Sequence, residues 1–261
     1  MLFRWLKKRR RHALLAEPFP APWLEILHER VILYRFLNEA EQANLRDALR
    51  ILIAEKAWEG CKGLALTDEI RVTVAALASI LLLGLREDYY DNVLTILVYP
   101  QAFRAPDHRP VAADLAVHGE SEHLGEAHLR GPVILSWADI AEDAAQPGFG
   151  RNLVFHEFAH QLDMQNGEAD GVPVLPRPLR QRWQRVMAQE FQRLCRAADR
   201  ERDTFLDPYG ATDEAEFFAV VTEAFFDQPL ELRERHPKLY ELLREYYQVE
   251  PVQWFERMAG K

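Results

Sequence analysis

Residues 152–163 read NLVFHEFAHQLD, and the interpretation of the whole chain starts from this stretch. Drawn as a helix at about 100° per residue, it places His160 and Asp163 within about 40° of His156. The apolar residues gather on the opposite side: Val154, Phe155, Phe158 and Leu162. This two-sided pattern predicts an amphipathic helix with one face in the core and the other open to a cleft.

The same stretch contains the pattern HExxH. Two residues four apart on a helix project from one face, so His156 and His160 can each offer an imidazole nitrogen to one metal ion. Glu157 lies beside that face, where a carboxylate can accept a proton from a water molecule activated by the metal. A chain of this length shows the pattern by chance in roughly a few per cent of cases, and the two-sided hydrophobicity argues against chance. Asn152 is expected to cap this helix and Gly167 to end it.

Composition and charge restrict the class of protein. The chain has 261 residues, of which 48% are hydrophobic and 28% charged, as in soluble globular proteins. Its net charge of −9 argues against a general nucleic-acid binder, because phosphates are neutralised by a basic surface. Cys61 and Cys195 cannot build a disulfide framework, which favours a reducing compartment and predicts a cytoplasmic protein.

The N-terminal segment, residues 1–19, is basic, and its apolar residues precede its charges. A secretory signal needs the reverse order and a longer apolar core, so none is expected. We predict a solvated, mobile tail, with a weak contact to a membrane surface or a partner as the alternative. The longest apolar run, residues 72–85, is too short to span a bilayer and predicts a core helix, so no stable membrane insertion is expected.

The first third of the chain carries helical patterns. Apolar residues have helical spacing over residues 20–37. Asn38 is expected to cap a second helix that continues to about Glu59, and Thr67 to cap a third helix that ends near Gly84. This region shows no chemistry of its own and is expected to cover one side of the catalytic half.

Two strands are predicted before the HExxH stretch. Residues 93–99 and 132–137 are rich in aliphatic residues. The second strand is a candidate edge along which an extended substrate can hydrogen-bond, through Ile134, Leu135, Ser136 and Trp137. Residues 139–150 predict a surface connection, 167–178 a loop and 179–198 an amphipathic helix. Three histidines between the strands have a five-residue spacing that argues against a second metal site: His118, His123 and His128.

A third metal ligand is needed, because catalytic zinc sites use three protein ligands and leave a position for water. The predicted helix at 213–227 offers Glu216 and Glu223 on one face, and the spacing alone does not choose between them. Glu216 can instead close a capping box with Asp213. Glu223 and Asp163 can instead orient a ligand histidine from outside the metal shell, or be solvated.

Several motifs together resemble a known family. The chain has HEFAHQLD at 156–163, YG at 209–210, EAEFFA at 214–219 and GPVILSW at 131–137. This arrangement resembles the MtfA (Mlc titration factor A) family of zinc-dependent peptidases, which is related to the catalytic domain of anthrax lethal factor. The resemblance runs from about residue 20 to 255 and does not include the basic N-terminal run.

The resemblance implies a role for individual residues. His156, His160 and Glu216 would hold one zinc ion per chain, Glu157 would be the general base, and Tyr209 would donate its phenolic hydrogen to the oxyanion. From the residues alone, Tyr209 in its Pro-Tyr-Gly turn favours a packing role. Two histidines and a carboxylate also suit cobalt or manganese in vitro.

The resemblance further implies small, aminopeptidase-like peptide substrates and the transcriptional repressor Mlc as a partner. The acidic residues near the cleft that could anchor a substrate α-amine are Asp163, Glu168 and Asp170, although solvated loop acids are the simpler interpretation.

The sequence thus predicts an α+β, zincin-like metallopeptidase of the gluzincin type. It would have a small mixed sheet, an active-site HExxH helix and an N-terminal helical layer. After a tail at 1–19, residues 20–261 would form one domain, with the helical layer at 20–90 and the catalytic part at 91–261. The alternative is a non-catalytic cytoplasmic factor that sequesters a repressor and keeps the metal site as structure. A regulator acting directly on DNA fits poorly with the acidic charge.

Overall fold

Side-chain caps start the helices of the N-terminal third where the sequence predicts them. The backbone N–H of Glu41 donates to Asn38 Oδ1 over 2.9 Å, and the N–H of Asn38 donates to the Glu41 carboxylate over 2.7 Å, which forms a capping box. Thr67 Oγ1 accepts a hydrogen bond from the N–H of Ile70. These local bonds satisfy backbone donors that the first turn of a helix leaves free.

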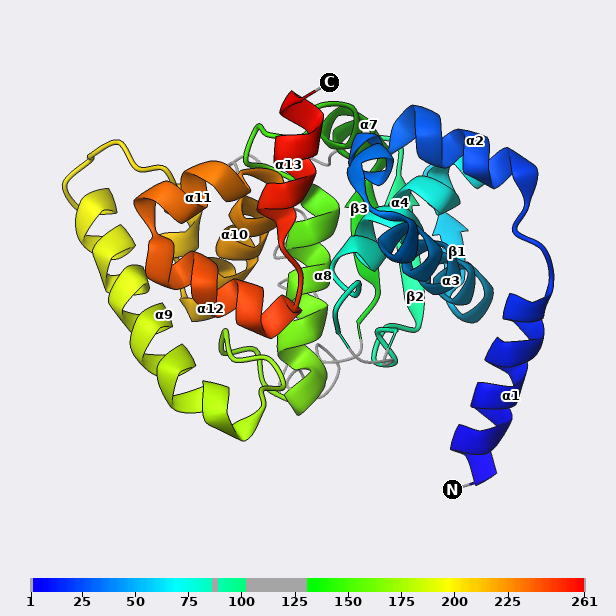
Figure 1. Ribbon diagram of the computed structural model, residues 1–261, viewed down its shortest axis with the longest axis horizontal. Coiled ribbons are helices and arrows are strands. Elements are labelled where there is room, and N and C mark those ends of the chain that lie inside the picture. Colours follow the sequence, from blue (N-terminus) through cyan, green and yellow to red (C-terminus); the bar gives the residue numbers. More distant parts are fainter. Residues whose placement is uncertain (1, 86–88, 102–130, 261) are drawn as a thin grey trace.

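The computed structural model describes residues 2–85, 89–101 and 131–260, without the side chains of residues 2–4. Figure 1 shows its elements in chain order. They are α1 (Leu2–Ala16), α2 (Ala21–Arg30), the 3-10 helix η1 (Ile32–Phe36), α3 (Glu39–Glu55), β1 (Ala57–Gly60), α4 (Asp68–Ile80), β2 (Thr95–Tyr99), β3 (Val133–Ser136), α7 (Trp137–Ala145), α8 (Leu153–Asp163), the 3-10 helix η2 (Met164–Asn166), α9 (Arg177–Ala198), the 3-10 helix η3 (Pro208–Ala211), α10 (Glu214–Asp227), α11 (Pro229–Arg235), α12 (Pro237–Tyr247) and α13 (Pro251–Ala259).

The described strands form one small parallel sheet in the order β1-β2-β3. Trp58 pairs with Ile96 and Ile96 with Val133, so the three strands are in direct register. The prediction of a mixed sheet is wrong for this part of the chain, because both pairings are parallel. A parallel pair needs a crossover, and α4 supplies the one between β1 and β2. The many helices around a small sheet agree with the predicted α+β class.

Two element boundaries differ from the sequence prediction. The helix predicted to reach about Glu59 ends at Glu55, because Ala57–Gly60 pairs with β2 as β1. Residues 139–150, predicted as a surface connection, mostly belong to α7, which buries Ile140 and Ala144. Trp137 is therefore the first residue of α7 rather than a strand residue, and Ser136 Oγ caps the helix by accepting from the N–H of Asp139.

Helix α8 lies at the centre of the molecule. It packs against β3 and α4 on one side and against α10 on the other. In Figure 1 the helices α9 to α12 lie beyond α8 on one side, and the sheet with α2, α3 and α4 lies on the other. The rings of Phe155 on α8 and Phe226 on α10 are 5.5 Å apart between centroids, and both are fully buried. The core therefore runs through α8 and fixes its position.

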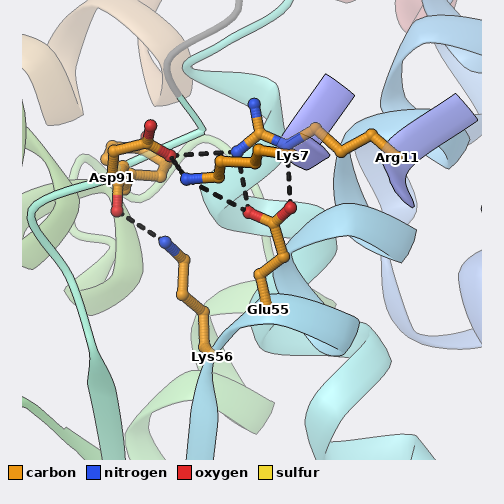
Figure 2. Close-up of polar contacts among 6 residues, drawn as sticks. Lys7, Arg11, Glu55, Lys56 and Asp91 are labelled. Carbon is orange, nitrogen blue, oxygen red and sulfur yellow. Dashed lines mark hydrogen bonds and ion pairs between the residues drawn. The ribbon is translucent and has the colours of Figure 1, made fainter. Parts of the chain in front are cut away.

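The N-terminal segment is not an isolated tail. Residues Leu2–Ala16 form α1, which reaches the rest of the molecule through Lys7 and Arg11 (Figure 2). Their carboxylate partners are Glu55 at the end of α3 and Asp91 before β2, far away in sequence. Sequence patterns do not reveal such pairs, which explains the prediction of a mobile tail. None of the helices within the described ranges combines the length and apolarity needed to cross a bilayer.

Candidate metal centre

The HExxH stretch forms α8, with the start and stop that the sequence predicts. Asn152 Oδ1 accepts a hydrogen bond from the N–H of Phe155 over 3.0 Å. After Asp163 the chain continues as η2 and turns at Gly167, whose φ of 95° lies in the left-handed region that glycine tolerates. The cap and the turn fix where α8 begins and ends, and with it the position of its polar side chains next to α10.

Three possible ligand atoms meet at one point between α8 and α10. The Nε2 atoms of His156 and His160 are 3.3 Å apart. Glu216 Oε2 lies 3.0 Å from the first of them and 3.5 Å from the second. Within the described residues these three side chains are the group whose geometry suits a metal ion. The structure therefore brings the carboxylate of Glu216, rather than that of Glu223, close to both Nε2 atoms.

The arrangement fits a bound cation. Glu216 Oε2 is buried and forms no hydrogen bond, although two imidazole nitrogens face it. A buried carboxylate oxygen without a donor is unfavourable, and a cation shared with both histidines would satisfy it. Two imidazoles and one carboxylate form a ligand set of catalytic zinc sites. The capping alternative explains only part of the geometry: Asp213 accepts from the N–H of Glu216, while the Glu216 carboxylate turns towards the histidines.

Glu223 supports the ligand histidine from behind. Its Oε1 lies 2.7 Å from His156 Nδ1, and its Oε2 accepts a hydrogen bond from the N–H of Asn152 over 2.6 Å. One carboxylate on α10 thus holds both the ring of His156 and the first turn of α8. Such a bond fixes which nitrogen of the imidazole faces the metal. This is the position expected for a carboxylate that orients a ligand from outside the metal shell.

Asp163 lies elsewhere, although the helical wheel placed it near the ligands. Its side chain is fully buried, and Oδ2 accepts a hydrogen bond from the N–H of Gly171 over 2.8 Å. It forms no hydrogen bond with either histidine of α8. Burial raises the pKa of Asp163 to about 6. The carboxylate therefore anchors the loop after α8, while Glu168 and Asp170 lie exposed on that loop.

The ionisation of the ligands is consistent with a cation site. Burial lowers the pKa of His156, but Glu216 and Glu223 outweigh it and raise that pKa well above its ordinary value. Burial raises the pKa of Glu216, but the two histidines outweigh it and hold that pKa well below its ordinary value. The carboxylates thus stabilise positive charge at this point. A divalent metal ion would take the place of the proton on His156.

Glu157 and Tyr209 flank the ligand atoms. Glu157 is 6% exposed, and burial raises its pKa despite the neighbouring histidines. Tyr209 is on η3, and its ring centroid lies 6.1 Å from that of His156. Burial and the Glu216 carboxylate raise the pKa of Tyr209, so its phenol keeps its proton at neutral pH. The structure thus brings together a buried carboxylate and a hydrogen-bond donor beside the three ligands.

The predicted edge strand lies close to the metal helix. β3 is at one edge of the sheet formed by the described strands, and it packs against α8. Ile134, Leu135 and Ser136 belong to β3, whereas Trp137 does not. The residues His118, His123 and His128 lie outside the described residues.

Two further carboxylates near the site have no signal in the sequence. Asp143 accepts a hydrogen bond from the N–H of Leu153 over 2.9 Å, and Asp227 accepts from the N–H groups of Gly148 and Gly150. Both carboxylates hold the segment that leads into α8. Burial raises the pKa of Asp143 to about 7 and that of Asp227 to about 6.

Two histidines of α8 and a carboxylate of α10 around one point, with an acid beside them, are the arrangement of a metallopeptidase-type site. Residues 3–248 match the family described as "Glucose-regulated metallo-peptidase M90". The chain therefore belongs to that family of metallopeptidases.

Named relatives agree with this assignment. Proteins named Mlc titration factor A are 32% identical in Yersinia enterocolitica, over 92% of this chain and 90% of the relative, and 31% identical in Serratia proteamaculans, over 86% of each. An uncharacterized protein of Synechocystis sp. is 40% identical over 95% of this chain and 90% of its own length. The expected membership of the Mlc titration factor A family is thus confirmed.

Proposed function

We propose that this protein is a zinc-dependent peptidase that hydrolyses peptide bonds, with a glutamate as third metal ligand as in gluzincins. The observation that carries the proposal is the meeting of His156, His160 and Glu216 within coordination reach of one point, with Glu157 buried beside them. Membership of a metallopeptidase family supports it. A purely structural zinc site is usually closed by four protein ligands and does not need a base next to the metal.

Zinc held by His156, His160 and Glu216, one ion per chain, would supply Lewis acidity that polarises the scissile carbonyl and lowers the pKa of water. Glu157 takes a proton from the attacking water and passes it to the leaving amine. Its raised pKa makes it a stronger base than an exposed glutamate. Tyr209 keeps its phenolic proton and donates a hydrogen bond to the developing oxyanion. Glu223 holds His156 in the orientation that the ligand role requires.

The proposed substrates are short peptides cleaved in an aminopeptidase-like manner. The residues of β3, Ile134 to Ser136, offer backbone groups next to α8 at an edge of the sheet that the described strands form, where an extended peptide can add as a further strand. The cytoplasm is the proposed location, because Cys61 and Cys195 are both free thiols.

A second candidate function rests on the relatives. Several of them are named for titrating Mlc, so we propose Mlc, or a repressor like it, as a partner of this chain. In the strict alternative the protein only sequesters that repressor, and the metal is structural. Glu157 separates the two functions, because sequestration does not use a base.

The test compares wild type with Glu157→Gln on a panel of chromogenic peptides and aminoacyl anilides, with zinc quantified in both preparations. The proposal expects about one zinc per chain in both and hydrolysis by the wild type only. Chelation should abolish that hydrolysis and zinc should restore it. Equal cleavage by both proteins would exclude Glu157 as the base. Zinc in both without cleavage, also in the presence of the repressor, would favour the binding factor.

A further inference from the structure

Helix α1 concentrates positive charge in an acidic protein. Residues 2–16 contain six Lys or Arg residues and no Asp or Glu, whereas the whole chain has a net charge of −9. In Figure 1, α1 lies at the periphery of the molecule, away from α8 and the helices that surround it. The chemistry proposed for the metal centre does not involve these charges.

Two of the cations fix the orientation of α1. The guanidinium of Arg11 donates to both oxygens of Glu55, over 2.8 and 2.7 Å, and to Asp91 over 2.9 Å. Lys7 Nζ donates to Asp91 over 2.6 Å, and the guanidinium of Arg50 donates to the carbonyl of Leu14. Figure 2 shows Lys7 and Arg11 converging on the two carboxylates. These contacts determine which side of α1 turns towards the rest of the protein.

Trp5, Leu6, Arg9 and Arg10 are on the solvent-exposed part of α1, and we call these four residues the outer face of α1. Trp5 is 56% exposed and Leu6 47% exposed, and both arginines are exposed. The Arg9 guanidinium carbon lies 5.6 Å from the ring centroid of Trp5, so a cation and an indole lie side by side. Neither Arg9 nor Arg10 forms an ion pair with any residue in the described ranges.

We propose that the outer face of α1 binds anionic lipid headgroups and attaches the protein to the surface of a membrane. Interfacial helices combine basic residues, which approach the negatively charged headgroups, with Trp and Leu side chains, which enter the boundary with the acyl chains. The outer face has both components. Nucleic acid would be attracted by the cations alone and would leave Leu6 exposed. The proposal does not depend on the metal site.

The geometry favours attachment in the plane of the membrane. The outer face runs along the side of α1, not at one of its ends. Lys7 and Arg11, on the inner side, are already paired with Glu55 and Asp91. The two carboxylates nearest α1 are therefore already paired with cations on its inner side, which lowers their repulsion of an anionic surface. The attraction is screened by salt and weakens within a Debye length.

The experiment is co-sedimentation of the full-length protein with phosphatidylcholine vesicles that contain about one third phosphatidylglycerol. The wild type should bind these vesicles, bind pure phosphatidylcholine vesicles far less, and dissociate as salt is raised. Arg9→Gln/Arg10→Gln should lower the partition coefficient about tenfold or more, because each basic residue contributes separately. Trp5→Ser should lower it as well and make the remaining binding more sensitive to salt.

A matched control is Arg200→Gln/Arg202→Gln, which removes the same charge from two exposed arginines between α9 and η3. This variant should bind like the wild type. Circular dichroism and the melting temperature should stay unchanged in all variants, because the altered side chains are exposed. Equal loss in the control would mean that net charge decides, and would overturn the proposal. So would unchanged binding by Arg9→Gln/Arg10→Gln, no binding by the wild type, or tighter binding to duplex DNA than to the vesicles at the same salt concentration.

Discussion

At the scale of the residue, the chemistry of this site depends on carboxylates that look alike in the sequence. Glu216 and Glu223 lie seven residues apart on one helix, yet one faces both histidine Nε2 atoms and the other holds the far nitrogen of His156. The difference arises because Glu223 lies beside the start of α8, where it also accepts from the N–H of Asn152.

Glu223→Gln should weaken zinc binding. Loss of the negative charge behind His156 and of one of two acceptor oxygens should raise the dissociation constant about 10- to 100-fold. Competition with a chromophoric chelator measures this constant. Asp163→Asn is the matched control, because that carboxylate lies on α8 without a hydrogen bond to either histidine. An equal effect in both variants would contradict the assigned role of Glu223.

Tyr209→Phe should lower kcat about 100-fold or more while zinc content stays the same. The variant removes only the phenolic hydroxyl, which we propose donates a hydrogen bond to the oxyanion of the transition state. Steady-state kinetics on the best peptide of the panel gives kcat and KM separately. A change in KM with an unchanged kcat would return Tyr209 to the packing role that its turn suggests.

The residues of HExxH were predictable because their spacing is local: a helix places positions four apart on one face whatever surrounds it. The helical wheel did not identify the hydrogen-bond partner of Asp163, because the angle of a residue on a helix does not show which loop packs against its side chain. Gly171 turns back over the end of α8 and takes that carboxylate as its acceptor. Asp143 and Asp227 act on segments that the sequence does not connect to them, so no pattern identified them.

At the scale of the element, Asp163 joins α8 to the loop that follows. Its pKa of about 6 is above the ordinary value of 3.8, so the folded protein binds the proton more tightly than the unfolded chain. The stability from this group is fully present below about pH 4 and is lost as the pH rises to about 6.

Asp163→Asn should therefore flatten the pH dependence of stability. Relative to wild type, the fall in the free energy of unfolding between about pH 4 and pH 7 should shrink by about 2–3 kcal/mol. Urea unfolding at the two pH values measures it. Glu168→Gln, which changes an exposed carboxylate on the same loop, should keep the wild-type slope. If the slope of Asp163→Asn also stayed the same, burial of Asp163 would not be coupled to folding.

Elements with strong local signals were predicted well, and elements defined by distant partners were not. The capping box at Asn38 and the cap at Thr67 start α3 and α4 where the sequence says. β1 was missed because its four residues continue a helical pattern and become a strand only by pairing with β2. The parallel direction of the sheet was missed for the same reason.

At the scale of the whole molecule, the N-terminal helical layer meets the C-terminal helices at Gly84. A β-carbon on Gly84 would lie 2.2 Å from the carbonyl oxygen of Tyr247 and 2.6 Å from that of Gln248. This contact leaves no room for a side chain at position 84, and the single domain at residues 20–261 stays a prediction.

Gly84→Ala should destabilise both halves together, by about 1–3 kcal/mol or more, because backbone on one side must shift. Hydrogen exchange during urea unfolding, followed by mass spectrometry, reports residues 20–90 and 91–261 separately. Both should unfold at the same, lowered urea concentration. Gly260→Ala is the control, because its added carbon would be 3.5 Å from the nearest atom. Separate transitions would contradict a single domain.

The three candidate ligands belong to two different helices, so their geometry depends on how these helices pack. Two candidate ligands are on α8 and one is on α10, so a shift of one helix along the other would change the distances between the three ligand atoms. Coordination tolerates errors of only about half an ångström. Side chains packed between the two helices, such as Phe155 and Phe226, would therefore affect the affinity for a metal ion without contacting it. α11 and α12 pack against α10, so a displacement of either helix would act on the same distances.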